Sequence, residues 1–82
     1  MASFYPHLYR AALALCVEAR VRAGLTPADL AARFGHSEAL VSSYEEGRRF
    51  LDPAEYIAIC RAIGVDPYAL LGQAEDDSVG LA

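Results

Sequence analysis

The chain has 82 residues, of which 55% are apolar, and its 11 acidic and 7 basic side chains give a formal net charge of −4. That length allows one small hydrophobic core, and no stretch reaches the roughly 18 to 20 apolar residues that a membrane span requires. The first ten residues, MASFYPHLYR, lack the charged start and apolar segment of a signal peptide. We therefore expect a single domain that stays in the cytoplasm.

The charges are unevenly distributed along the chain. Residues 20–51 hold five arginines and four acids, a balance of +1, whereas residues 52–82 hold six acids and one arginine, a balance of −5. Only the middle of the chain could therefore face the phosphates of a nucleic acid.

Proline and glycine divide the chain into helices. The segments TPAD at 26, DPAE at 52 and DPYA at 66 each offer an N-cap residue followed by proline in the first helical position. The first two also place an acid three residues after the cap, as in a capping box. Glycines able to end a helix follow at Gly24, Gly35, Gly47, Gly64 and Gly72. We predict an all-α chain with helices over about 6–23, 27–34, 38–46, 53–63 and 67–71.

Apolar spacing assigns an inward face to each predicted helix. The residues expected inside are Leu8, Leu15, Cys16, Ala19, Leu30, Ala31, Phe34, Val41, Tyr44, Tyr56, Ile57, Ile59, Cys60, Ile63, Val65, Leu70 and Leu71. The two cysteines are expected to be reduced core residues, and a redox or metal role is the less favoured alternative. The acidic segment 74–82 is expected to be a disordered tail after a domain spanning residues 1–73.

The middle of the chain combines small, apolar and turn residues in one pattern. The pattern consists of Leu30, Ala31, Phe34, Gly35, Val41 and Tyr44, followed by YEEGRR, LDPAE and CRAIGVDPYALL. With it, residues 16–71 resemble the lambda-repressor-like, or Xre-type, helix-turn-helix regulators. The resemblance implies a five-helix DNA-binding domain with the helix-turn-helix at about 27–46. In such a unit Ala31 lets two helices approach, Gly35 makes the turn, and the second helix presents its outer face to a major groove.

The resemblance also implies which residues would meet DNA. The base-reading positions would be Glu38, Ala39, Ser42 and Ser43. The phosphate contacts would be Arg48 and Arg49, with Arg33, Arg22 and Ser37 as further candidates. A partly buried pair is implied between Arg20 and Glu45, for which ordinary solvated charges are the alternative.

Three positions depart from the family pattern. Glu38 stands where glutamine is favoured, Ser43 stands where longer polar or basic side chains are common, and Pro27 replaces a glutamine whose N–H can engage phosphate. Glu38 can still accept a hydrogen bond from cytosine N4. Its alternative role is that of a favourable charge in the first turn after the Ser37 cap.

These observations predict a sequence-specific transcriptional regulator. We expect a repressor that binds double-stranded DNA at a palindromic operator, is encoded by a bacterium or phage, and associates with the nucleoid when bound. The alternative is a helix-turn-helix module that binds protein, as a co-regulator, anti-repressor or antitoxin, because the basic content is low. No enzyme activity, cofactor or metal is expected, since His7 and His36 have no nearby catalytic or ligating partners.

A homodimer is also expected. Apolar and aromatic side chains lie outside the minimal motif in greater number than one small core can easily bury. They are Phe4, Tyr5, Leu8, Tyr9, Tyr68 and Leu71. Two copies would double the phosphate contacts and read two half-sites roughly 34 Å apart.

Overall fold

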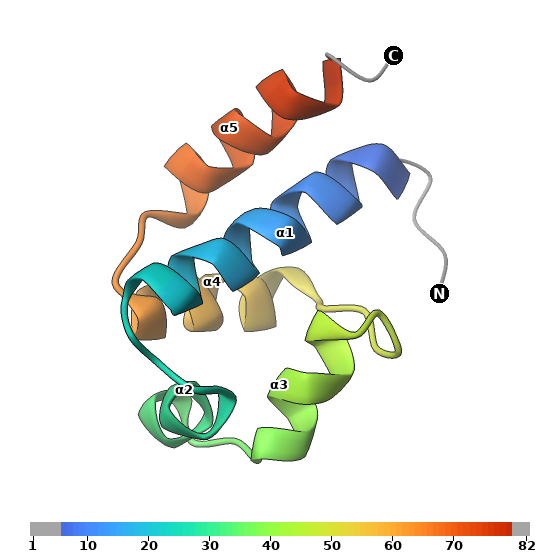
Figure 1. Ribbon diagram of the computed structural model, residues 1–82. Coiled ribbons are helices and arrows are strands. Elements are labelled where there is room, and N and C mark those ends of the chain that lie inside the picture. Colours follow the sequence, from blue (N-terminus) through green and yellow to red (C-terminus); the bar gives the residue numbers. More distant parts are fainter. Residues whose placement is uncertain (1–5, 80–82) are drawn as a thin grey trace.

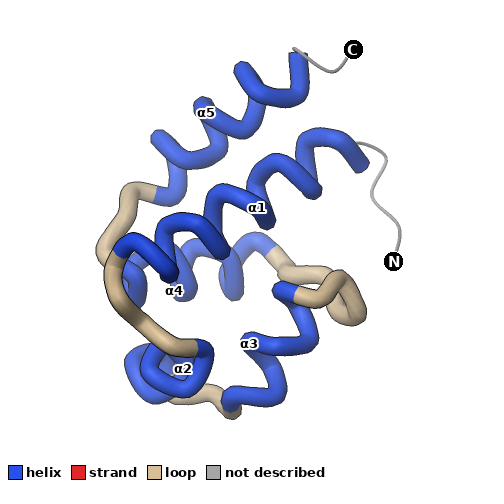
Figure 2. Tube along the Cα trace, in the orientation of Figure 1, coloured by secondary structure: helices blue, strands red, loops and turns tan. Residues whose placement is uncertain are grey.

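Five helices joined by short loops make up the computed structural model, which describes residues 6–79 (Figures 1 and 2). They are α1 (Pro6–Arg22), α2 (Pro27–Phe34), α3 (Glu38–Glu45), α4 (Pro53–Ile63) and α5 (Pro67–Val79). No strand occurs in this part of the chain. The predicted all-α class is confirmed, and the observed ends of α1 and α3 each fall one residue before the predicted ones. None of the described helices is long and apolar enough to cross a bilayer.

The helix starts form through the side chains that the sequence places there. At α2 the Thr26 hydroxyl accepts a hydrogen bond from Asp29 N at 3.1 Å, and the Asp29 carboxylate accepts one from Thr26 N at 3.0 Å. At α4 the Asp52 carboxylate accepts from Glu55 N at 2.7 Å, and Glu55 accepts from Asp52 N at 3.0 Å. Both predicted capping boxes are therefore present, and they fix where each helix begins.

The turn between α2 and α3 depends on Gly35. Its φ of 76° lies in the left-handed region, which side chains with a Cβ rarely adopt. Its N–H bonds to Ala31 O and closes the last turn of α2. Ala31 is buried where the two helices pack, so the small side chain and the glycine together set the short connection.

Two buried clusters hold the helices together. The first joins α2, α3 and α4 through Leu30, Ala31, Val41, Tyr44, Ile59 and Ile63. The second joins α1, α4 and α5 through Ala12, Cys16, Cys60, Leu70 and Ala74. Most of the other residues expected inside are half-buried against these clusters. Leu71 was expected in the core, but its side chain is exposed, because Leu70 takes the inward position of the last helix.

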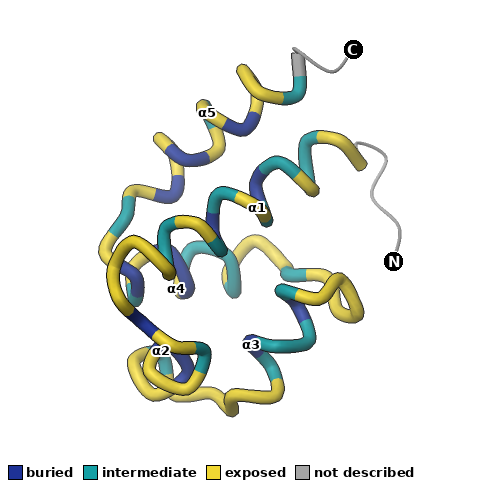
Figure 3. Tube along the Cα trace, in the orientation of Figure 1, coloured by how far each residue is buried: buried dark blue, intermediate teal, exposed yellow. Residues whose placement is uncertain are grey.

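The last helix extends further than the sequence predicts. It was expected to stop at Leu71 before Gly72 and to be followed by disorder, yet α5 continues to Val79. Leu70 and Ala74, one turn apart, both pack into the second cluster, and α5 lies along α1 (Figures 1 and 3). The expected disorder is therefore wrong for residues 74–79, because contact with α1 outweighs the glycine and the acids. Residues 80–82 lie outside the described chain.

Candidate nucleic-acid interface

Helix α3 has one buried side and one open side. Val41 and Tyr44 are completely buried against α2 and α4. On the other side Glu38 and Ala39 are exposed, and Ser42 and Ser43 are half-buried. The four residues that the family resemblance suggested as base readers are thus on the accessible part of α3. Because the side chains of Ala39, Ser42 and Ser43 are short, this part of the helix backbone could come close to a ligand.

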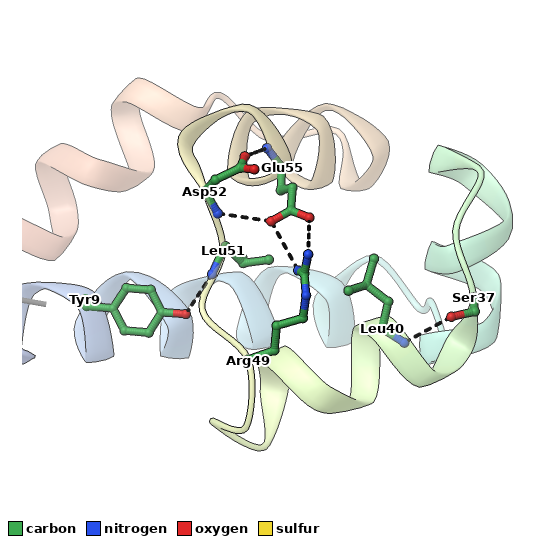
Figure 4. A network of polar contacts seen from close by, with 7 residues as sticks. All are labelled: Tyr9, Ser37, Leu40, Arg49, Leu51, Asp52 and Glu55. Atoms are coloured by element: carbon green, nitrogen blue, oxygen red, sulfur yellow. Dashed lines mark hydrogen bonds and ion pairs between the residues drawn. The ribbon is translucent and has the colours of Figure 1, made fainter. Parts of the chain in front are cut away.

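Ser37 caps the start of α3. Its Oγ accepts a hydrogen bond from Leu40 N at 3.2 Å (Figure 4). That contact uses the oxygen as an acceptor, so the hydroxyl hydrogen remains available to donate to a phosphate oxygen. Glu38 follows in the first turn, where a negative charge is favoured by the helix dipole.

The far end of α3 is tied to α1 by a charged pair. Arg20 donates from Nε to Glu45 Oε2 at 2.7 Å and from Nη2 to Glu45 Oε1 at 2.9 Å. Its Nη1 also donates to Leu25 O at 2.7 Å, and only 12% of either charged side chain is exposed. The bond to Glu45 raises the pKa of Arg20. The pair implied by the resemblance is present. Of the three acids at α3, Glu38, Glu45 and Glu46, it turns Glu45 away from solvent.

Arg48 and Arg49 follow α3, and their side chains differ in how firmly ion pairs hold them. Gly47, with φ of 80°, ends the helix and leads into the loop. Arg48 pairs with the neighbouring Glu46 at 2.9 Å, and both side chains are more than half exposed. Arg49 instead donates two hydrogen bonds to Glu55, at 2.6 and 3.1 Å (Figure 4). Arg48 is therefore the more available of the two for a phosphate.

Glu55 is the residue that restrains Arg49. The hydrogen bond from Arg49, followed by that from Asp52 N, lowers the pKa of the Glu55 carboxyl. The carboxylate is thus shared between the capping box of α4 and the arginine. The sequence predicted the cap of α4 from its local spacing, but no local pattern showed that Glu55 would also bind Arg49.

The other two predicted phosphate contacts have partners elsewhere. Arg33 donates from Nη1 to Ala62 O in α4 at 3.1 Å. Arg22 pairs with Glu18 within α1, on the exposed side of that helix. These partners hold both side chains near helices other than α3, so the structure does not bring them together with Arg48.

The loop after α3 is braced by a residue that sequence reasoning did not select for this purpose. Tyr9 of α1 accepts a hydrogen bond from Leu51 N at 3.3 Å (Figure 4). Its ring lies 4.9 Å from the ring of Phe50, centroid to centroid. The loop that carries both arginines is therefore held by α1 as well as by α4. Tyr9 was considered only as a surplus aromatic residue, because no local signal links two positions so far apart.

Comparison with known proteins identifies this arrangement. A family model described as a helix-turn-helix domain matches residues 18–71. A solved structure, an XRE-family like protein from Pseudomonas syringae pv. tomato str. DC3000, is 48% identical over 84% of each chain, with a TM-score of 0.81. This chain belongs to the Xre-type helix-turn-helix family. A comparison with functionally curated proteins gives no significant match.

Membership in the Xre-type family supports a DNA-binding regulator as the general function. The helix-turn-helix unit is α2, the Gly35 turn and α3, and α3 is the helix expected to enter a groove. Among residues 6–79 no group of three or more His, Cys, Asp or Glu side chains gathers in a way that could hold a metal ion.

Proposed function

We propose that this Xre-type protein is a transcriptional repressor that binds a palindromic operator in double-stranded DNA as a homodimer. The observation that supports it is the open side of α3, where Glu38, Ala39 and Ser42 are accessible while the opposite side is fixed in the core. The Arg20–Glu45 pair and the Tyr9 contact hold both the helix and the following loop in place. A rigidly held helix with one open side can enter a major groove without a change of fold.

Within this proposal the contacts divide into reading and anchoring. The side chains of Glu38, Ala39, Ser42 and Ser43 read base edges, by hydrogen bonds and by contact with a thymine methyl group. Arg48 and the Ser37 hydroxyl anchor phosphates at the two ends of α3. An eight-residue helix is about 12 Å long at 1.5 Å per residue, so these anchors lie on either side of the reading positions.

A second candidate function is a protein-binding module. It is favoured by the ion pairs, since Arg22, Arg48 and Arg49 each have a glutamate partner, and by the net charge of −4. Arginines that are neutralised in this way attract a polyanion weakly. Such a module would use the same open side of α3 for a protein partner.

Selection from random duplex DNA at low salt tests the first proposal against the second. A DNA reader recovers a preferred sequence with two-fold symmetry, and its half-sites are about one helical turn apart. Failure to enrich any sequence, together with no retention on a heparin column, would make protein binding the leading function.

Three variants then test the assigned roles on the selected site. Arg48→Ala should weaken binding to all sequences alike and reduce the slope of log affinity against log salt by roughly one phosphate contact per subunit. Arg10→Ala, on the exposed side of α1, is the matched control and should leave the slope unchanged. Glu38→Gln should strengthen non-specific binding. It should also reduce the free-energy discrimination between bases at one position of each half-site by roughly 1 to 3 kcal/mol.

Glu55→Gln is the most informative change. Glutamine retains an acceptor for Asp52 N, so the capping box survives, but it removes the charge that holds Arg49. The released arginine should strengthen DNA binding and steepen the salt dependence. If Glu55→Gln leaves affinity and slope unchanged while Arg48→Ala weakens binding, Arg49 is not a latent phosphate contact.

A further inference from the structure

An apolar groove lies between α1, the loop before α4, and the facing sides of α4 and α5. Its volume is about 300 Å³. Ala12 and Cys16 of α1 lie at its floor, since both are buried, whereas Leu71 of α5 lies at its exposed edge. The groove is therefore open to solvent on one side and ends against the core.

The groove is found where the two buried clusters meet. Leu13 and Leu51 line it and pack against the first cluster, and Leu8 and Tyr56 line it and pack against the second. Ala12, one turn after Leu8, contributes only a methyl group. Protein interiors are closely packed and leave few voids larger than a water molecule. An apolar space of this size between two clusters is therefore room that a bound molecule can fill.

Polar groups at the wall of the groove select the kind of molecule. The Tyr9 hydroxyl accepts a hydrogen bond from Leu51 N at 3.3 Å, and both residues line the groove (Figure 4). That contact uses a lone pair of the oxygen, so the hydroxyl hydrogen can donate to an oxygen of a ligand. Asp52 is the only charged residue among the described residues of the lining, and its carboxylate would repel an anion. The lining therefore favours an uncharged molecule with an apolar body and one oxygen.

The size of the groove limits the ligand to a small molecule. An apolar cavity of about 150 Å³ is enough to hold benzene. With about 300 Å³, this groove has room for two fused rings and lies at the lower end of the range of small-molecule sites. The rings of Tyr9 and Tyr56 in its walls favour an aromatic body. The compounds that match are bicyclic aromatic alcohols.

We propose that the groove is a binding site for a small uncharged aromatic alcohol of two rings. The rings pack on Ala12 and against Tyr56, and the alcohol oxygen accepts a hydrogen bond from the Tyr9 hydroxyl. The Tyr9–Leu51 contact also holds the loop that carries Arg48. A bound ring thus contacts the residues that fix this loop.

The experiment is titration of the whole chain with 2-naphthol at neutral pH, without DNA, so that its result is separate from that of the proposed repressor function. Calorimetry should give one molecule bound per chain with a dissociation constant of roughly 0.1 mM or lower, as a ligand of this size allows. In nuclear magnetic resonance spectra the amide signal of Leu51 should shift, because its N–H contacts Tyr9, whereas that of Arg33 in α2 should not. The matched anion 2-naphthoate should bind at least roughly tenfold more weakly, because its carboxylate loses water and meets Asp52.

Matched variants separate binding in the groove from binding elsewhere. Ala12→Leu should fill the groove and abolish measurable binding of 2-naphthol. Ala14→Leu, at an exposed position of α1 outside the groove, is the control and should bind as the wild type does. Tyr9→Phe keeps the ring and tests the site even if Ala12→Leu does not fold. It should weaken binding of 2-naphthol roughly fivefold, the equivalent of one hydrogen bond, and leave binding of naphthalene unchanged.

Other occupants of the groove give different results. If a second copy of the chain fills it, light scattering should show that the mass of the assembly halves when 2-naphthol is added. If residues 1–5 of the same chain fill it, Phe4→Ala should raise the affinity for 2-naphthol. Either result would overturn the proposal, as would equal binding of 2-naphthol and 2-naphthoate. A folded Ala12→Leu chain that binds 2-naphthol as well as Ala14→Leu does would also overturn it.

Discussion

Tyr44 combines a well-buried ring with a hydroxyl group whose burial is unfavourable. The ring is completely buried, while the hydroxyl has no hydrogen-bond partner among residues 6–79. Burial raises the pKa of this phenol, as expected for a group that has lost its hydration. Leaving a buried donor unpaired costs about 1 to 3 kcal/mol.

Tyr44→Phe should therefore stabilise the fold. Phenylalanine keeps the ring and removes the unpaired hydroxyl, so we expect the free energy of unfolding in urea to rise by about 1 kcal/mol. Tyr56→Phe is the matched control, because the Tyr56 hydroxyl donates to Pro67 O at 2.7 Å, and its loss should destabilise the chain. A destabilised Tyr44→Phe protein would mean that the hydroxyl is satisfied in solution.

The Arg20–Glu45 pair should show energetic coupling that a surface pair lacks. With only 12% of each side chain exposed and two hydrogen bonds between them, we expect a double-mutant coupling of about 1 to 3 kcal/mol on replacement by alanine. The exposed pair Arg22–Glu18 is the control and should show almost none. If urea denaturation gives equal coupling energies for the two pairs, the Arg20–Glu45 pair does not stabilise the fold more than a surface pair does.

At the scale of the element, the start of α4 responds to pH through Glu55. Arg49 and the Asp52 N–H lower the pKa of this carboxyl in the folded state. The folded pKa is below the unfolded one, so the stabilisation is present above the unfolded value, near 4.3, and is lost as pH falls through the folded value.

The difference in the free energy of unfolding between the wild-type chain and Glu55→Gln should depend on pH. The wild-type chain should have a higher free energy of unfolding than Glu55→Gln at pH 7. The difference should shrink as the pH falls below the unfolded pKa and vanish once the folded carboxyl is protonated. Chemical denaturation at a series of pH values measures it. A gap that stays constant over this range would show that the charge of Glu55 does not contribute.

Local chemistry explains which features of the elements could be predicted. The helix starts at Pro27 and Pro53 follow from capping residues within four positions, and all five helices were predicted from such starts together with the glycines that end helices. The end of α5 could not be predicted, because Ala74 is buried in a cluster with residues of α1 and α4, which are distant in the sequence. The restraint on Arg49 was missed for a different reason, since Glu55 was already explained by the cap and Arg49 contacts it from a loop outside any helical spacing.

At the scale of the whole molecule, the proposed homodimer has a specific surface. Leu71 is exposed at one wall of the apolar groove, and Phe50 and Tyr68 are also exposed. Phe4 and Tyr5, which the sequence suggested as further contributors, lie outside the described residues. A dimer would cover apolar area that water otherwise contacts.

Leu71→Glu should convert the dimer into a monomer. Light scattering at micromolar concentration should give twice the 8.8 kDa chain mass for the wild type and the single mass for the variant. The variant should also bind the selected operator more weakly, because half of the phosphate contacts are lost. Val21→Glu, at an exposed apolar residue of α1 that does not line the groove, is the control. A wild-type chain that scatters as a monomer with and without DNA would rule out this assembly.

The pairing of α5 with α1 has a consequence for the order in which the chain is made. The cluster of Leu30, Val41 and Ile59 can assemble as soon as α4 has left the ribosome, because all three residues belong to α2, α3 and α4. Ala12 and Cys16 on α1 cannot be fully buried until Leu70 and Ala74 of α5 have been synthesised. Throughout that interval the nascent protein displays an apolar stripe on its earliest helix, which is the kind of surface that chaperones bind.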